Sequence, residues 1–366
     1  MQLIFKFARA QVLIAETNDV RAFARLLRGI GLKHNAVMTI SEAGFEVTVE
    51  EIRTLCGEDL EDSILLTSTK ILSYDVAIAW IPTNLFTTFE FHKSASSEPA
   101  CFEISLDALL QCLNIFGNAA PSSGGNILPP MARSKRRWAG EDDDSVVGST
   151  DDRPRGGKEK RTGMRMVWSG PGHPLSMLLQ DDAKGPMTKC ELTPLEPEEL
   201  MNQEFNSDDC VLYFIMKSEW FRDALLDLPP SCTRITLIAT PRDQPKPAEM
   251  PDATGSSSNA RRTHRAAVGQ FSLQAVGDFG QTELDYPNDK EVMDKFDCVK
   301  EVSFSYHSSH FALLSRALTQ SIKICVQVES TGFLCVQVMM PVAEGVPVGE
   351  HSGILEFKMH ALEDEE

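Results

Sequence analysis

Apolar residues follow two spacings along this chain, and each spacing predicts a different kind of element. Recurrence every three or four residues predicts four helices, at 19–30, 105–116, 217–227 and 309–320. Between them, alternating apolar and polar residues predict antiparallel strands, including a hairpin that turns at 41–44. This mixture predicts an α+β fold with the helices gathered on one face of the sheets.

The first predicted helix has two distinct faces. At about 100° per residue, Arg21, Arg25 and Arg28 lie within about 60° of one another. Asn18 or Asp19 can cap its first turn, and Gly29 or Gly31 can end it in a left-handed turn. The opposite face is apolar: Val20, Phe23, Leu26, Leu27 and Ile30. The arginine face is either a solvated basic surface or a surface that binds anions.

Charge restricts how this protein can meet nucleic acid. The 366 residues carry a formal net charge of -18, so most of the surface repels phosphate. Any contact with nucleic acid must be local, and basic residues are most concentrated in the first predicted helix.

The cysteines and the apolar runs indicate which cellular compartment and which kinds of site the sequence favours. The nine cysteines are scattered and form no CxxC, which predicts buried thiols in a reducing compartment and no metal or cofactor. Lys6 and Arg9 interrupt the apolar start of the chain, so no signal peptide is expected. Charged residues and Pro82 interrupt 64–86, which excludes a membrane span there.

Composition divides the chain into two ordered halves. The expected first domain covers 1–190 and the second 208–366, joined by an acidic, proline-punctuated connector at 191–207. Polar segments predict disorder at 118–161 and 242–265, and 361–366 is an acidic tail. The predicted hairpin at 326–338 resembles the one at 38–49, which suggests a weak internal repeat.

Two basic clusters in the segment 118–161 are candidates for a bipartite nuclear import signal, and the alternative is a solvated run of charge. Their basic residues are Lys135, Arg136, Arg137, Lys158, Lys160 and Arg161. This signal would place the protein in the nucleus.

The order of motifs resembles the sliding DNA clamps and, within them, the Rad one or Rec one checkpoint subunits of the nine-one-one ring. The resemblance spans nearly the whole chain. It is carried by VRAFARLLRGIG, AVMTISEAGFEVTVEE, ISLDALLQCLNIFG, MRMVWSGPGHPLSMLL, ELTPLEPEEL, MKSEWFRDALLDLP, FSLQAVGDFGQTELDYP and STGFLCVQVMMP, in the family's order.

The resemblance implies the DNA-clamp fold and a role in assembly. Two similar domains would place antiparallel sheets outside and two helices each along an inner channel. The expected partners are two other clamp subunits in a heterotrimeric ring, a clamp loader, and double-stranded DNA at primer-template junctions, bound without sequence specificity. The implied function is a non-catalytic clamp subunit that encircles damaged DNA in nuclear checkpoint signalling and DNA repair.

Carried onto this sequence, the resemblance names candidate residues. The DNA-facing residues would be Arg21, Arg25, Arg28, Lys217, Arg222 and Arg316. The connector would bind client proteins through Leu192, Leu195 and Leu200, unless these leucines belong to the core. The pattern does not identify which edge strand meets which partner. Residues 56–79 interrupt the family's pattern and are either a genuine insert or the result of a mispredicted splice.

The alternative functions are a 3′–5′ exodeoxyribonuclease, as described for some members of this family, and an adaptor that does not touch DNA. A two-metal nuclease needs several carboxylates that converge on its ions. The paired acids at 142–144, 181–182 and 208–209 fall at turns or in the predicted disorder, without a shared face. We therefore expect no catalytic residues.

Overall fold

The computed structural model describes residues 13–55, 70–92, 100–119, 161–182, 184–201, 203–229, 231–241, 269–277, 280–341 and 352–362. Four helices occur in these ranges: α1 (Arg21–Gly29), α2 (Leu106–Leu113), α3 (Ser218–Asp227) and α4 (Ser308–Leu318). Each of them confirms a predicted helix to within three residues at either end. Two short 3-10 turns, η1 (Thr83–Leu85) and η2 (Ser207–Asp209), complete the helical elements of the described ranges.

The strands form three antiparallel sheets. In spatial order, the five-stranded sheet contains β5 (Thr88–Phe91), β1 (Leu13–Thr17), β7 (Thr162–Trp168), β8 (Leu175–Asp181) and β9 (Met187–Leu192). The nine-stranded sheet contains β14 (Met293–Cys298), β10 (Cys210–Lys217), β16 (Lys323–Glu329), β17 (Leu334–Met340), β18 (Gly353–Met359), β4 (Lys70–Pro82), β3 (Gly44–Leu55), β2 (Asn35–Ser41) and β6 (Ala100–Ser105). The four-stranded sheet contains β13 (Gly280–Tyr286), β12 (Gln270–Gly277), β11 (Cys232–Thr240) and β15 (Val302–His307). The predicted α+β class is therefore confirmed.

The strand order of the first half recurs in the second. The order β5-β1-β7-β8-β9 recurs as β14-β10-β16-β17-β18, and β4-β3-β2-β6 recurs as β13-β12-β11-β15. The nine-stranded sheet thus consists of five strands from the second half and four from the first. They are joined where β18 pairs with β4, from Ile354 opposite Trp80 to Met359 opposite Asp75.

The topology corrects the suggested repeat of hairpins. By position in the sheets, the hairpin β2–β3 is equivalent to β11–β12, and β16–β17 is equivalent to β7–β8. The resemblance between 38–49 and 326–338 instead links β2–β3 with β16–β17, which occupy different positions in the sheets. Both are alternating strands joined by a tight turn, so the local pattern does not record where a hairpin lies in the fold.

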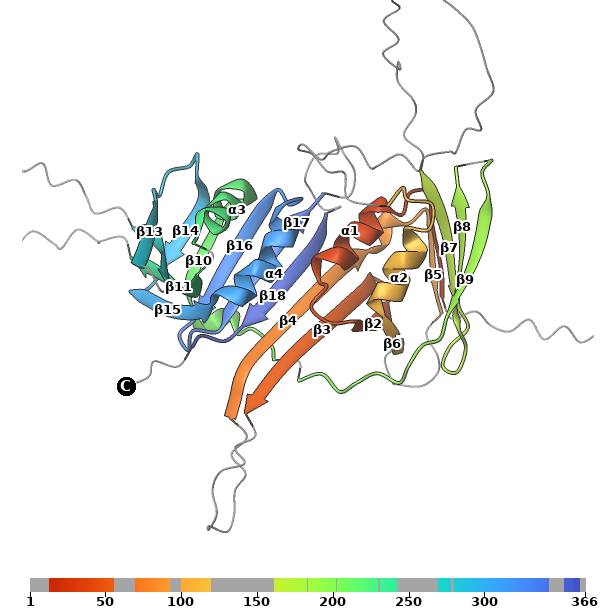
Figure 1. The fold of residues 1–366 in the computed structure, drawn as a ribbon, viewed down its shortest axis with the longest axis horizontal. Coiled ribbons are helices and arrows are strands. Elements are labelled where there is room, and N and C mark those ends of the chain that lie inside the picture. Colours follow the sequence, from red (N-terminus) through yellow and green to blue (C-terminus); the bar gives the residue numbers. More distant parts are fainter. Residues whose placement is uncertain are drawn as a thin grey trace, which may run out of the picture.

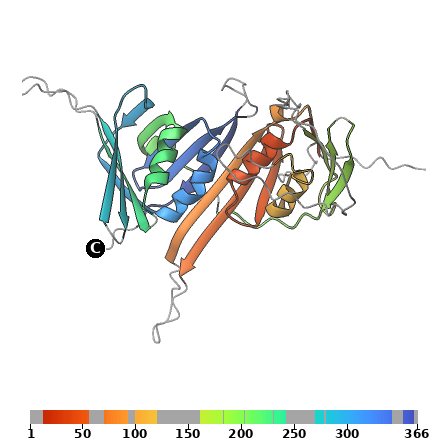
Figure 2. The same cartoon turned by 45° about the horizontal axis from the view of Figure 1, so that its top comes forward.

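All four helices lie on one face of the sheets, with α1 and α4 side by side in the middle, α2 beyond α1 and α3 beyond α4 (Figures 1 and 2). A single apolar core joins the helices to all three sheets. In α1, Phe23, Leu26 and Leu27 are buried, as the helical spacing predicted. Their burial holds the arginine face of α1 outward.

Gly29, the last residue of α1, does not form the expected left-handed turn. Neither Gly29 nor Gly31 has the positive φ of a left-handed turn. A Cβ on Gly29 would lie 2.2 Å from Cδ1 of the buried Leu355 in β18. The glycine is needed because the helix approaches β18 closely, and this packing across the junction of the halves is not visible in local sequence.

The structure describes only the last part of the expected insert at 56–79. Residues 56–69 lie outside the described ranges, but from Lys70 the chain forms β4, which pairs with β3 and β18. Residues 70–79 therefore belong to the central sheet. Most of the predicted disordered segments 118–161 and 242–265 lies outside the described ranges, as do residues 363–366 of the acidic tail.

Candidate nucleic-acid interface

The arginine face of α1 begins with a local ion pair. The N-cap residue of α1 is Val20, which makes no side-chain cap, but Asp19 Oδ1 accepts a hydrogen bond from the backbone N–H of Arg21 at 3.0 Å and so satisfies one donor of the first turn. The Arg21 Nη2 donates to Asp19 Oδ2 at 2.8 Å, and the Arg161 Nε lies 3.8 Å from the same oxygen. Burial favours a higher pKa for Asp19, but its bonds to Arg21 outweigh burial and lower the pKa.

The next two arginines face the middle of the helix layer. Arg25 Nη1 donates to the backbone oxygen of Pro341 at 3.1 Å, which ties α1 to the end of β17. The pKa of Arg28 is lowered, first by burial and then by the charge of Arg25. Arginine stays protonated at neutral pH regardless, because its pKa starts above 12. Two adjacent guanidinium groups therefore raise the local potential.

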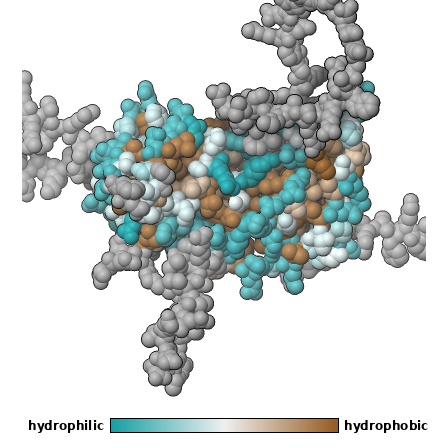
Figure 3. Space-filling view, viewed as in Figure 1, coloured by the Kyte–Doolittle hydropathy of each residue, from teal (hydrophilic) through white to brown (hydrophobic). Residues whose placement is uncertain are grey.

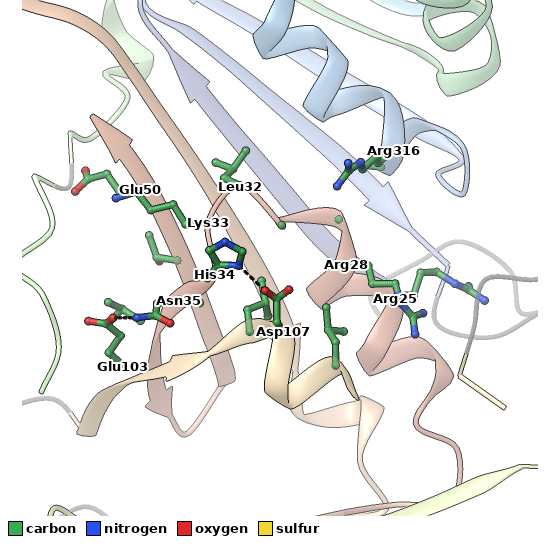
Figure 4. Close-up of a pocket in the computed structure, with 18 of the residues that line it drawn as sticks. Arg25, Arg28, Leu32, Lys33, His34, Asn35, Glu50, Glu103, Asp107 and Arg316 are labelled. Carbon is green, nitrogen blue, oxygen red and sulfur yellow. Dashed lines mark hydrogen bonds and ion pairs between the residues drawn. The ribbon is translucent and has the colours of Figure 1, made fainter. Parts of the chain in front are cut away.

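Arg316 of α4 faces the same concavity as Arg25 and Arg28, which measures about 880 Å³ (Figure 4). The concavity extends past Lys33 and His34 toward the connector. Acidic residues also line it: Glu50, Glu103, Asp107, Glu198 and Glu199. In the close-up the labelled arginines lie together on one side, whereas Glu50 and Glu103 lie on the other. In Figure 3, hydrophilic residues extend across the middle of this face.

The other two predicted DNA-facing residues lie apart from this group. Lys217 is exposed at the start of α3. Arg222 donates from Nη2 and Nε to Asp223 Oδ1, at 2.8 and 2.9 Å. Neither residue lines the concavity of Arg25, Arg28 and Arg316. The structure thus brings together α1 and α4 residues, and it leaves the α3 residues separate.

The connector is held by carboxylates that sequence analysis did not single out. Leu195 and Glu103 exchange both backbone hydrogen bonds, at 2.8 and 3.1 Å. The buried Glu103 carboxylate also accepts from the N–H of Glu198 at 3.3 Å, and Glu50 accepts from the N–H of Met201 at 3.0 Å. Glu103 lies in β6 and Glu50 in β3, so this part of the connector crosses the strands of the nine-stranded sheet.

Further along, the connector meets strands of the second half. Lys358 Nζ in β18 donates to the backbone oxygen of Gln203 at 3.4 Å, and Glu329 in β16 accepts from the N–H of Asn206 at 2.6 Å. Phe205 stacks on Phe333 with ring centroids 6.3 Å apart. The only sequence signal for these contacts was an acid or lysine within otherwise apolar strands. Their connector partners are distant in sequence, so the pattern does not reveal them.

The three connector leucines have different surroundings. Leu192 lies in β9 and packs against the core. Leu195 is 51% exposed. Leu200 is half-buried and lines the concavity of the α1 arginines. A client groove formed by all three therefore stays a prediction.

The paired acids have individual structural roles. Asp181 accepts from Asn118 Nδ2 at 2.7 Å, and Asp209 accepts from Ser330 Oγ at 2.5 Å. Asp182 adopts a positive φ in a turn. Among the described residues, no three His, Cys, Asp or Glu side chains are grouped to hold a metal ion. Residues 142–144 lie outside the described ranges, as do all the predicted import-signal residues except Arg161.

No helix in the described ranges is long and apolar enough to cross a membrane.

The strand order and the arginine face together define an α+β protein of two topologically equivalent halves, with a local basic surface on its helix face. Comparison with known families matches residues 12–340 to the family described as repair protein Rad1/Rec1/Rad17. The chain belongs to this family.

Three relatives of this chain have names that refer to checkpoint control or DNA repair. The chain is 25% identical to the mouse cell cycle checkpoint protein RAD1, over 91% of this chain and 88% of the mouse protein. It is 24% identical to the DNA damage checkpoint control protein rad1 of Schizosaccharomyces pombe, covering 91% and 82% of the two chains. It is also 24% identical to the DNA repair exonuclease REC1 of Mycosarcoma maydis, covering 91% and 89%.

Proposed function

We propose that this protein is a non-catalytic subunit of a heterotrimeric sliding clamp, which encircles DNA in the nucleus during checkpoint signalling and repair. The repeated strand order is the observation that carries the proposal. Strands β9 and β13 each end a sheet in the described part of the chain, while their equivalents β18 and β4 pair with each other. The strands β9 and β13 are therefore the equivalents of two strands that already pair with each other inside this chain.

Pairing β9 of one subunit with the β13-like strand of the next would extend the sheets from chain to chain. A head-to-tail contact of this kind forms a closed ring if the rotation between subunits closes. An unpaired edge strand is also a template for further pairing. Two other clamp subunits would cover β9 and β13, and a clamp loader would open the ring for DNA.

The helix face would then line the channel. Arg25, Arg28 and Arg316 would contact phosphates, with Arg21 near them, whereas the predicted Lys217 and Arg222 lie apart from this group. Such contacts fix position without reading base sequence, so binding at primer-template junctions would depend on structure rather than sequence. The net charge of -18 would keep the rest of the surface away from DNA.

Proline substitutions in the edge strands test this assembly. Successive residues of an edge strand direct their N–H groups alternately to the neighbouring strand and to the open side. We would therefore make T188P and K189P in β9, and T282P and E283P in β13. In each pair, the variant that keeps the thermal unfolding midpoint of the isolated chain is the one altered only at the open edge.

The open-edge variant of β9 is expected to lose co-purification with one clamp-like partner, and that of β13 with the other. The second proline of each pair is the matched control, because it should lower stability by removing a bond inside the sheet. Retention of both partners by both open-edge variants would contradict ring assembly through these strands.

A metal-dependent 3′–5′ exonuclease is the second candidate, because the Mycosarcoma maydis relative is named an exonuclease. This candidate predicts that the purified chain digests DNA in the presence of Mg²⁺ and that the D181A/D182A double variant does not. Digestion by the native chain that the double variant loses would favour this candidate over the non-catalytic clamp.

A further inference from the structure

The four helices carry very different charges on their outward faces. Within Arg21–Gly29 of α1 there are three arginines and no acid. The exposed positions of α3 instead include Glu219, Asp223 and Asp227. These acids recur at intervals of four residues, so they lie along one side of the helix. The helix layer is therefore electrostatically divided.

We infer that α1 and α4 form the track for the duplex, and that the acidic face of α3 is a positioning element that keeps the phosphates away from its side. The inference rests on the proposed function and specifies how the clamp holds DNA. It assigns different roles to Arg316 and Arg222, although both are arginines on the same helix layer.

Arg222 is poorly suited to bind phosphate because it already has a carboxylate partner. Its guanidinium donates two hydrogen bonds to Asp223, the neighbouring residue. Besides this guanidinium and Lys217 at the start of the helix, α3 carries three exposed carboxylates. Exposed apolar side chains flank them, with Trp220 at 44% and Leu226 at 69% exposure. A phosphate near α3 would meet net negative charge.

The outward face of α4 has the opposite character. Ala312, Arg316 and Thr319 are exposed, Ser315 is partly exposed, and the helix contains no acid. Small side chains let a phosphate backbone approach closely, and the Ser315 and Thr319 hydroxyls donate within the helix, to Ala312 O at 2.7 Å and Ser315 O at 3.0 Å, so they add no charge to this face. Because α4 lies beside α1, Arg316 extends the charge of Arg25 and Arg28 across the junction of the halves (Figure 4).

The distances involved make this division effective. Exposed charges act over about 8 Å at physiological salt, less than the 10–12 Å diameter of a helix. The basic charge of α1 therefore does not cancel the acidic charge of α3. Each arginine that contacts a phosphate contributes about 0.9 to the slope of log K against log salt concentration.

The salt dependence of DNA binding by the assembled ring tests the inference. The ring would be titrated with a blunt, fluorescent DNA duplex at several NaCl concentrations. R28Q and R316Q should each reduce the slope by about 0.9. R222Q removes no phosphate contact, so it should leave the slope unchanged, and any change in affinity should be a small decrease because the α3 face becomes more acidic. R165Q is the matched control, since Arg165 is half-exposed on β7, on the side away from the core, and pairs with Glu16 at 3.3 Å.

Neutralising the acids of α3 gives the complementary measurement. The triple variant E219Q/D223Q/D227Q should bind the duplex several-fold more tightly at low salt, with an unchanged thermal unfolding midpoint because these side chains are exposed. An unchanged affinity in this variant, or a loss of slope in R222Q equal to that in R28Q, would overturn the inference. If R28Q and R316Q gave the same salt-dependence slope as the R165Q control, the proposed phosphate-facing surface itself would be wrong.

Discussion

At the scale of single residues, side-chain chemistry decides which predictions from sequence succeed. The outward position of the α1 arginines followed from helical spacing alone, because burying Phe23 and Leu27 leaves no other orientation. Partners outside the helix were not predictable. The bond from Arg25 to Pro341 spans 316 positions in sequence, and no local pattern records it.

His360 provides a prediction at this scale. Its ring lies 4.7 Å from that of Phe333, and its Nε2 lies 2.8 Å from Gln203 Oε1 of the connector. Burial lowers the pKa of His360, although the charge of Glu329 acts in the opposite direction. The unfolded chain therefore binds a proton at a higher pH than the folded chain does.

Stability linked to His360 is accordingly present above the unfolded-state pKa of about 6.5 and is lost as the pH falls through the lower pKa of the folded state. We expect the thermal unfolding midpoint to decrease between pH 7 and pH 5. The H360Q variant should decrease less over the same range. Parallel decreases in the two proteins would show that His360 does not contribute.

At the scale of elements, amphipathic helices and alternating hairpins were predictable because both patterns are local. The start of β4 and the course of the connector were not. The connector depends on the carboxylates of Glu50, Glu103 and Glu329, which are distant in sequence from the backbone groups they hold. The roles of glycines were not predictable either: Gly117 adopts a positive φ after α2, whereas Gly29, expected in a left-handed turn, allows close packing instead.

The β2–β3 hairpin gives a prediction for an element. Gly44 has a φ of +135°, and a Cβ there would lie 2.1 Å from the backbone oxygen of Ile81 in β4. G44A should lower the free energy of unfolding by about 2 kcal/mol or more, because backbone must move and the conformation is strained. Urea denaturation measures this loss.

Gly117 offers the matched control for that measurement. Its φ is +75°, and an added Cβ would have no atom within 4 Å. G117A should therefore cost only the conformational penalty of about 1–2 kcal/mol. A smaller loss in G44A than in G117A would contradict the close contact between the hairpin and β4.

At the scale of the whole molecule, the repeat of strand order has the largest functional consequence. The family resemblance implied two similar halves, but the equivalent hairpins were not predictable, since position in a sheet is a long-range property. The topology supplies what the sequence left open, namely that β9 and β13 are the candidate edges for neighbouring subunits. A ring built through them would hold DNA by enclosing it, with the arginines of α1 and α4 limiting how the duplex lies.

Retention on circular DNA tests this account most directly. The clamp loader would load the assembled ring onto a nicked circular plasmid, and a wash in high salt would weaken its contacts with phosphate. The amount of protein bound to the DNA would then be measured before and after a single cut linearises the plasmid. We predict that the protein stays on the circle through the wash and leaves once the DNA has ends. Loss from the intact circle in high salt, or equal retention on circular and linear DNA, would contradict encirclement.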